Sequence, residues 1–286
     1  MRFHLRYQVY ILTAALLLCG GSIFTSTAST GSKEIIFISG SGSSIGTMQL
    51  MAKSYQRKHP HVDVKVLPSI GSTGGIKAIN KDVIDIGLTN RLLRPEEKSA
   101  QIIEEPYGRT AFVFAVQDSN PIKGLTLAEI EEIYSGKRQT WPDGMPIRLI
   151  LRPLSDSYSA YLEGINPALK SASQKAHSIR GMFVGNTDQE ASAQIEKTPG
   201  SFGTTSMSLI AAEKPKIKAL SVDGSQPTLT NVSTGKYPYV HTLYIVYKKN
   251  KNRGAIKDFI EFVFSKDGQK LLSDNGLVTL SRITGK

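Results

Sequence analysis

The sequence contains few of the residues that form disulfides, metal centres and nucleophilic active sites. Its 286 residues include one cysteine, one tryptophan and five histidines. A single cysteine excludes an intrachain disulfide and any metal site built from several thiolates. The histidines are scattered, no H-E-x-x-H pattern occurs, and no turn has the Gly-Lys-Ser/Thr ending of a nucleotide-binding loop. A hydrolase needs a nucleophile beside a base. We therefore expect a non-enzymatic protein with no catalytic residue, metal or cofactor.

Acidic residues are the minority among the charged side chains. The chain has 24 Asp and Glu residues against 35 Lys and Arg residues, which gives a formal net charge of +11. Such an excess suits an anionic ligand, a nucleic acid or an anionic surface. The basic residues are spread along the chain, with no long Lys/Arg run and no aromatic–basic pattern of RNA recognition. We interpret the charge as a generally basic surface and expect no nucleic-acid partner.

Long apolar runs are missing except near the N-terminus. Arg2 and Arg6 precede an apolar run over residues 9–18, and small polar residues follow. The run is too short to span a bilayer, and the three-part pattern predicts a secretory signal peptide over residues 1–28. We expect export to the periplasm. A lipid anchor at Cys19, directly after the apolar run, is the alternative, and otherwise membrane contact would come only through a partner.

What the sequence has in quantity is hydroxyl-rich turns at the ends of predicted strands. An alternating apolar run over residues 62–66 predicts a strand, and the turn I-G-S-T-G-G-I over residues 70–76 leads into a predicted helix. The first amides of a helix have no partner inside it, and the helix dipole makes this end favourable for an anion. The hydroxyls of Ser72 and Thr73 add donors. Taken alone, such a turn is commonly just a helix cap.

Two further turns repeat this arrangement. A predicted strand over residues 33–38 runs into S-G-S-G-S-S at 39–44, and a strand over 147–151 runs into R-P-L-S-D-S at 152–157. A fourth predicted strand, residues 83–88, ends in Thr89-Asn90-Arg91. The alternation of strands and helices predicts an α/β fold with a mostly parallel sheet. Ligands bind such sheets outside the carboxyl ends of the strands, where these turns lie.

The sequence resembles the phosphate-binding proteins of bacterial ABC importers, which are type II periplasmic binding proteins. The resemblance covers nearly the whole predicted mature chain. The matching segments are GSTGGIK (71–77), DIGLTNR (85–91), SNPIKGLTLAEIEEIYSGK (119–137), VDGSQPTLTNVSTGKYP (222–238) and FIEFVFSKDGQKLL (259–272).

The resemblance implies a two-lobed α/β fold whose lobes are joined by two crossover strands, Thr110–Val116 and Tyr239–Tyr247. It places residues 29–114 and 240–286 in lobe 1 and residues 115–239 in lobe 2. An oxyanion would be held in the cleft, closing the lobes, and a monomer would deliver it to an ABC importer permease. The ligand-binding residues that the resemblance implies, together with their immediate neighbours, are Ser43, Ser44, Ile45, Ser72, Asn90, Arg152, Ser155, Asp156 and Ser157.

The chain departs from the family pattern in its candidate site. Asn90 stands where phosphate binders usually carry an aspartate, whose carboxylate accepts a hydrogen bond only from a protonated oxyanion. Ser155-Asp156-Ser157 replaces the usual S-G-T, and its distance from Arg152 is one residue shorter. Asp156 would either cap the following helix or replace the acceptor missing at Asn90. Arg91 would bind either the ligand or an acidic neighbour, and we expect the neighbour.

These departures leave two other interpretations open. One is a protein of the same fold that binds another oxyanion or a small organic anion. The other is a sensor or adhesion protein whose cleft has diverged. We expect a phosphate-binding protein, with Arg152 as the residue whose loss should weaken binding most.

Overall fold

The computed structural model describes residues 33–282. The predicted signal peptide over residues 1–28 and the alternative anchor at Cys19 lie outside the described residues. Within them, no helix combines the length and the apolar character that a membrane crossing requires.

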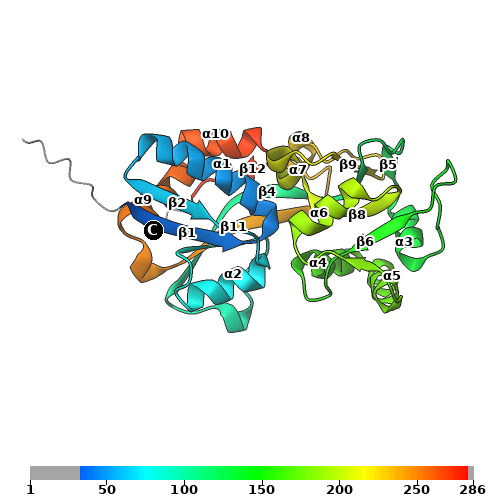
Figure 1. The fold of residues 1–286 in the computed structure, drawn as a ribbon, viewed down its shortest axis with the longest axis horizontal. Coiled ribbons are helices and arrows are strands. Elements are labelled where there is room, and N and C mark those ends of the chain that lie inside the picture. Colours follow the sequence, from blue (N-terminus) through cyan, green and yellow to red (C-terminus); the bar gives the residue numbers. More distant parts are fainter. Residues whose placement is uncertain (1–32, 283–286) are drawn as a thin grey trace, which may run out of the picture. The chain divides into compact units, whose positions relative to one another are not determined.

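The first part of the chain forms the predicted alternation of strands and helices (Figure 1). Strand β1 (Glu34–Gly40) pairs in parallel with β2 (Val62–Val66) on one side and with β3 (Ile86–Thr89) on the other. Helix α1 (Gly42–Lys58) follows β1 and helix α2 (Gly71–Asn80) follows β2. Both helices begin at the hydroxyl-rich turns, as the sequence predicts.

Two long strands connect this sheet to the rest of the chain. β4 (Ile102–Gln117) and β11 (Val240–Lys248) run antiparallel, and β11 also pairs with β3. The first half of β4 pairs with β11 and with β12 (Val278–Thr279). Its second half pairs with β8 (Ser201–Ser206) and β9 (Ile217–Ala219). The two halves of β4 therefore belong to different parts of the sheet.

The sequence pattern revealed only the second half of β4. Residues 110–116 are a dense apolar run, whereas the first half contains Pro106 and Gly108, which are uncommon inside strands. The register between β4 and β11 shifts at this point: Leu243 lies opposite Gly108 and Tyr244 lies opposite Pro106. The irregularity accommodates the proline, so the strand extends through a segment for which the sequence pattern predicts no strand.

Beyond the antiparallel pairing of β4 with β8, the next strands of the sheet are parallel to one another. β6 (Arg148–Leu151) lies between β8 and β7 (Phe183–Val184) and runs parallel to both. Its helices are α3 (Leu127–Ser135), α4 (Ser157–Ile165), α5 (Pro167–Ser178), α6 (Asp188–Lys197) and α7 (Met207–Glu213). The smaller elements are η1 (Pro95–Glu97), β5 (Gly124–Leu125), β10 (Ser221–Val222), α8 (Leu229–Ser233) and η2 (Lys249–Lys251). The chain then forms α9 (Gly254–Phe264) and α10 (Lys266–Asp274).

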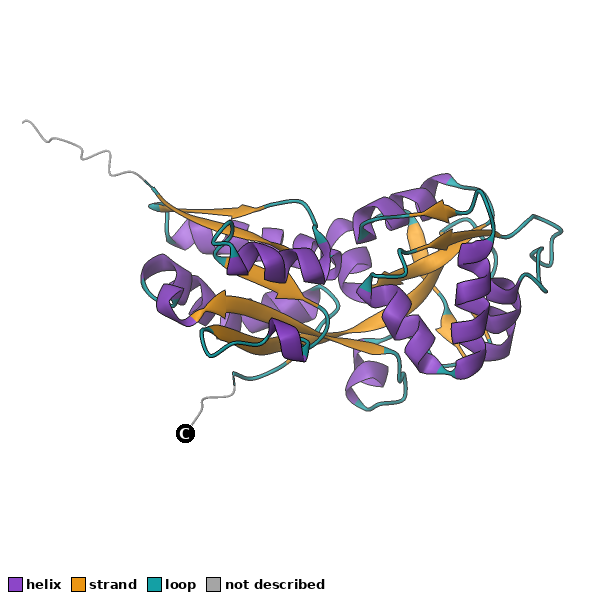
Figure 2. Ribbon diagram, turned by 90° about the horizontal axis from the view of Figure 1, so that it is seen from below, coloured by secondary structure: helices purple, strands orange, loops and turns teal. Residues whose placement is uncertain are grey.

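The apolar side chains form two main cores, one in each part of the sheet. One core combines residues of β1, α1 and β3 with residues of β11, α9 and α10. The other is built around Phe112, Phe114, Trp141 and Phe202, with the rings of Phe114 and Phe202 stacked 5.7 Å apart. Helices pack on the strands in both parts (Figure 2). The predicted α/β class is confirmed, and the strands' carboxyl ends carry the predicted turns.

Candidate functional site

The first predicted turn forms the N-terminus of α1. The chain leaves β1 through Ser41, whose N–H donates to the carbonyl of Leu88 at 2.8 Å, and the helix begins at Gly42. The Ser41 side chain does not cap the helix but lies 2.8 Å from the Oγ of Ser43. Ser44 is fully buried, and its Oγ accepts a hydrogen bond from the Tyr107 hydroxyl at 2.7 Å. The helix therefore begins with no acidic residue and no side-chain cap of its own.

The second turn lies beside the first. The carbonyl of Gly40, at the end of β1, accepts hydrogen bonds from the Ser69 hydroxyl at 2.9 Å and the Ile70 N–H at 3.2 Å. Gly75 of α2 packs so closely on β1 that a Cβ there would lie 3.0 Å from the Cα of Gly40. Helix α2 starts at Gly71, whose φ of +71° favours glycine. The two turns thus form one surface at the carboxyl ends of β1 and β2.

Ser72 and Asn90 are brought together on this surface. The Ser72 hydroxyl donates to the Asn90 Oδ1 at 2.8 Å and accepts from the Asn90 N–H at 3.2 Å. Both residues are buried, and the Nδ2 of Asn90 has no hydrogen-bond partner among the described residues. A buried donor without a partner costs free energy. Asn90 therefore offers a donor where the family pattern supplies an acceptor.

Arg152 is buried in the third turn, with its guanidinium surrounded by acceptors. Its Nη1 donates to the carbonyl of Gly185 at 2.9 Å, and its Nη2 lies 3.1 Å from Asp156 Oδ2 and 3.9 Å from Asp188 Oδ2. The guanidinium also lies 5.5 Å from the ring centre of Tyr158. One cation therefore faces two carboxylates.

Asp156 caps helix α4, which is one of the two roles that the sequence left open. Its Oδ1 accepts from the Tyr158 N–H at 2.9 Å while its carboxylate pairs with Arg152. Its neighbours differ in exposure: Ser157 is partly buried, and Ser155 is exposed. The structure thus brings Arg152 and Asp156 together but places Ser155 at the surface.

Asp188 is the residue that the sequence analysis missed. It is the first residue of α6, behind the capping Thr187, and the pattern T-D-Q-E is typical of any helix start. In the structure it is buried, and burial raises the pKa of its carboxyl, with the neighbouring Arg152 opposing the shift. A Cβ on Gly42 would lie only 2.2 Å from Asp188 Oδ2. Asp188 therefore bridges the first and third turns.

A chain of side-chain contacts joins the third turn to Asn90. Tyr158, beside Arg152, lies 5.0 Å from the ring of His241 on β11. Burial lowers the pKa of His241 to about 3, opposed by a hydrogen bond with the backbone of Asn90. The neutral imidazole of His241 therefore lies between Tyr158 and Asn90. Its Nε2 has no hydrogen-bond partner among the described residues. The second and third turns are therefore connected through this interior region.

Arg91 pairs with an acidic neighbour, as the sequence predicts. Its guanidinium contacts both oxygens of Glu97, at 2.7 and 2.8 Å, and lies 3.1 Å from the Thr73 hydroxyl. These hydrogen bonds to Arg91 are the main cause of the lowered pKa of Glu97. A bidentate pair of this kind occupies the arginine.

Residues 42–46 read G-S-S-I-G, which fits the G-x-S-x-G pattern of hydrolase nucleophile elbows. The serine of that pattern, Ser44, is bonded to the Tyr107 hydroxyl rather than to a base. His177, on α5, is held by the carbonyls of Ser173 and Arg152. Among residues 33–282, no group of three His, Cys, Asp or Glu residues is placed to hold a metal. The pattern at Ser44 therefore lacks the base that a hydrolase needs.

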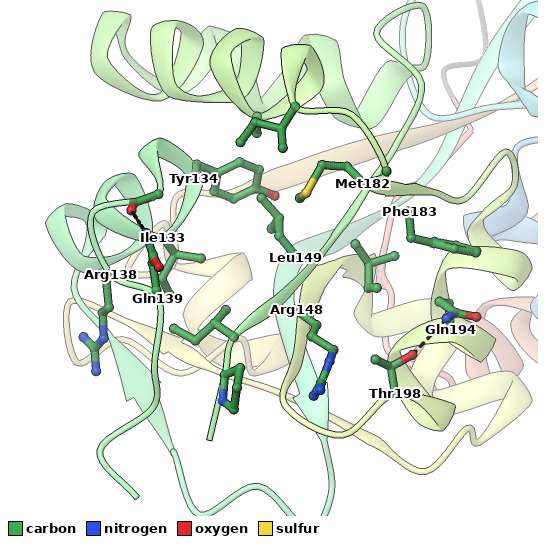
Figure 3. A pocket seen from close by; sticks show the side chains of 17 residues that line it. Ile133, Tyr134, Arg138, Gln139, Arg148, Leu149, Met182, Phe183, Gln194 and Thr198 are labelled. Atoms are coloured by element: carbon green, nitrogen blue, oxygen red, sulfur yellow. Dashed lines mark hydrogen bonds between the residues drawn. The ribbon is translucent and has the colours of Figure 1, made fainter. Parts of the chain in front are cut away.

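Two cavities of about 560 Å³ lie near these elements, and they differ in kind. One borders the site, between α1, the loop before α2, and helices α6 and α7, with Ile45, Gln189 and Glu213 in its wall. The other lies in the second part of the sheet, where Tyr134, Leu149 and Met182 turn toward one another (Figure 3). Arg148, in its wall, comes from the amino end of β6, opposite the end that carries Arg152. The second cavity is thus separate from the three turns.

Comparisons with known proteins identify the family of the chain. A family model described as a PBP superfamily domain matches residues 25–267. The phosphate-binding protein PstS of Bacillus subtilis is 25% identical over 259 residues, covering 85% of this chain and 80% of that protein. Protein SphX of Synechococcus elongatus is 25% identical over 283 residues, covering 91% and 81%. A Clostridium perfringens structure with bound phosphate, described as a phosphate ABC transporter substrate-binding protein, is 26% identical with a TM-score of 0.73, covering 87% of this chain and all of that one.

Proposed function

Because the chain belongs to the PBP superfamily, we propose that it is an extracytoplasmic solute-binding protein that captures phosphate and delivers it to an ABC importer permease. The similarity to PstS and to the phosphate-bound Clostridium structure supports phosphate as the ligand. The observation that carries the proposal is the contact of Asp188 with both the N-terminus of α1 and the buried guanidinium of Arg152, beside the N-terminus of α4. Amide and hydroxyl donors with one planar cation are suited to an oxyanion.

The lobes are proposed to be residues 29–114 with 240–286, and residues 115–239. The composition of the two main cores supports this division in outline, since the first contains residues up to Tyr107 and from Leu243 onward, and the second contains Ala111 to Tyr237. The second core therefore includes residues 111–114, which the division assigns to the first lobe. β4 and β11 would be the crossovers and would bend as the lobes close. Anion binding would favour the closed form because only that form contacts the ligand from both sides.

The ligand is proposed to bind between the two lobes. One lobe would contribute the α1 N-terminus at Ser43, Ser44 and Ile45, with Ser72 and Asn90 beside it. The other would contribute Arg152, Ser155, Asp156 and Ser157. Among residues 33–282 the Nδ2 of Asn90 has no hydrogen-bond partner, which supports its role as a donor to the ligand. Ser155 requires the most change, because it is exposed in this structure.

Export and partners follow from the same proposal. The protein would leave the cytoplasm through the segment 1–28, either as a soluble monomer or anchored by lipid at Cys19. It would act as a carrier and not as an enzyme, and its closed form would dock on the permease. The membrane would be contacted through that permease or through the anchor.

Binding can be tested by calorimetric titration of the full chain with inorganic phosphate. We expect saturable binding that is weakened at least a hundredfold in Arg152→Ala, because that variant removes the one buried guanidinium of the proposed site. Arg253→Ala is the matched control, since Arg253 lies at the start of α9, away from the three turns. Equal loss in both variants, or no binding by the wild-type chain, would contradict the proposal.

A second candidate function is binding of a different oxyanion or a small organic anion by the same cleft. It is favoured by Asn90, which lacks the carboxylate acceptor, and by the two carboxylates beside Arg152. The same titration with sulfate and with small carboxylates separates the two. Tighter binding of sulfate than of phosphate would favour this second function. A sensor or adhesion role would be indicated if no anion bound.

A further inference from the structure

The carboxylate of Asp188 lies where an anion is expected at the N-terminus of α1. Its Oδ2 is so close to Gly42 that a Cβ on that glycine would overlap it, and the Gly42 N–H favours its ionised form by hydrogen bonding. The helix supplies no capping side chain from Ser41 and no acidic residue in its first turn. A carboxylate from another element therefore takes the position that helix N-termini normally offer to an anion.

The same carboxylate also faces the cation of the site. Its Oδ2 is 3.9 Å from Arg152 Nη2, and its side chain is 5% exposed. Arg152 already pairs with Asp156, so with Asp188 the single guanidinium faces two carboxylates. The Asp188 carboxylate already contacts the N-terminus of α1 and faces Arg152, which are the two groups that a bound dianion would use. It would therefore repel an entering dianion.

The neighbouring residue strengthens the contact between α6 and α1. Gln189 Nε2 donates to the Gly42 carbonyl at 3.0 Å and to Glu213 Oε1 at 2.8 Å. The hydroxyl of Ser208, at the start of α7, donates to the carbonyl of Ser43 at 2.7 Å. Three residues from α6 and α7 thus hold the first turn of α1, and Asp188 supplies the negative charge among them.

We infer that Asp188 is an internal counter-anion that competes with the ligand for the N-terminus of α1 and for Arg152. The inference rests on the proposed function and concerns the affinity of the same site. Asp188 caps α1 when no ligand is present, and an oxyanion binds by displacing its carboxylate. The residue therefore sets the ligand concentration at which the site fills.

The competition predicts that removing the charge of Asp188 tightens phosphate binding. In calorimetric titrations of the full chain with inorganic phosphate, Asp188→Asn should bind at least tenfold more tightly than the wild type. Glu190→Gln is the matched control, because it removes a carboxylate two residues later on the same helix, where the side chain is exposed and accepts from the Asn186 N–H. That control should stay within about twofold of the wild type. Equal or weaker binding by Asp188→Asn would overturn the inference.

A second measurement needs no ligand. In phosphate-free buffer, hydrogen exchange of the amides at residues 42–45 should be at least tenfold faster in Asp188→Ala than in the wild type, and unchanged in Glu190→Ala. Unchanged exchange in Asp188→Ala would overturn the capping contact. If the proposed function fails, neither the wild type nor Asp188→Asn will bind phosphate, and the exchange comparison will still support or overturn the contact by itself.

Discussion

Two arginines of this protein sit at the carboxyl ends of strands, and they are neutralised in different ways. Arg91, after β3, is matched by one carboxylate, Glu97, with both partners partly accessible at 18% and 12% of the side-chain surface. Arg152, after β6, is 3% accessible and faces Asp156 and Asp188. The pair at Arg91 lowers the pKa of its acid, whereas the cluster at Arg152 contains an acid whose pKa is raised.

The difference separates a structural pair from a candidate site. A matched bidentate pair has satisfied its charge and has little left to offer a ligand. A buried cation between two carboxylates is strained electrostatically, because burial disfavours the excess charge. Perturbed carboxyl groups beside a cation are typical of functional sites. The comparison therefore favours the Arg152 cluster over Arg91 as the ligand-binding region.

The largest expected effect comes from removing Arg152, with the removal of Arg91 as the comparison. Arg152→Ala leaves two carboxylates without their buried partner, which costs about 3–5 kcal/mol of folding free energy. Arg91→Ala breaks a more exposed pair and should cost about 1 kcal/mol. Urea unfolding of the two variants measures both values. Equal losses would remove the distinction between the two arginines.

A smaller effect is expected at the contact that joins the second turn to β3. Ser72→Ala removes the hydroxyl that bonds both the side chain and the backbone of Asn90. Because buried groups of Asn90 then lack partners, the variant should lose about 1–3 kcal/mol of folding free energy. The matched control is Ser54→Ala, on α1, whose hydroxyl makes an exposed contact with Arg57. Urea unfolding should show a loss of folding free energy for Ser72→Ala only. An unchanged folding free energy would mean that other contacts hold the second turn to the end of β3.

Asp188 and Glu97 should change the folding stability in opposite directions as the pH rises. The pKa of Asp188 is raised in the folded protein, so near that pKa the folded state binds more protons than the unfolded state. The folding free energy contributed by this group therefore weakens as the pH rises above the pKa of Asp188 in the unfolded chain. The charged and polar groups that face the Asp188 carboxyl are Arg152, Asp156, Tyr158, Glu213 and the Gly42 N–H.

Glu97 has a lowered pKa, so its contribution is present above the unfolded value and is lost as pH falls through the folded pKa. Unfolding free energies from pH 3 to pH 7 should therefore diverge. The stability of Asp188→Asn relative to the wild type should rise with pH, and that of Glu97→Gln should fall. Parallel profiles would contradict the assigned shifts.

The smallest effect is expected from a charge-conserving change at Arg91. Arg91→Lys keeps the cation but loses the two-point contact with Glu97. We expect a loss of about 0.5 kcal/mol of folding free energy and no change in phosphate affinity. A clear loss of affinity in the calorimetric titration would show that Arg91 reaches the ligand.

Local chemistry explains which features could be predicted from the sequence. The turns at Ser43, Ser72 and Asp156 follow strands and begin helices, and short-range patterns record such starts. The capping role of Asp156 and the pairing of Arg91 depend on residues within a few positions. Helix α3 is another example, with a capping box between Thr126 and Glu129 and a left-handed Gly136 at its end.

Features set by tertiary contacts could not be predicted in this way. Asp188 is a normal first residue for α6, and only the approach of Gly42 and Arg152 gives it a role. The first half of β4 was hidden by Pro106 and Gly108, which the register shift against β11 accommodates. The exposure of Ser155 depends on how its turn leaves β6, which residue types do not specify.

A crystal structure of the protein grown with millimolar phosphate tests most directly whether an oxyanion displaces Asp188 from the N-terminus of α1. We expect one phosphate within hydrogen-bonding distance of the Arg152 guanidinium and the first amides of α1, with the Asp188 carboxylate moved away from Gly42. A phosphate bound elsewhere on the surface, with Asp188 still against Gly42, would contradict this expectation.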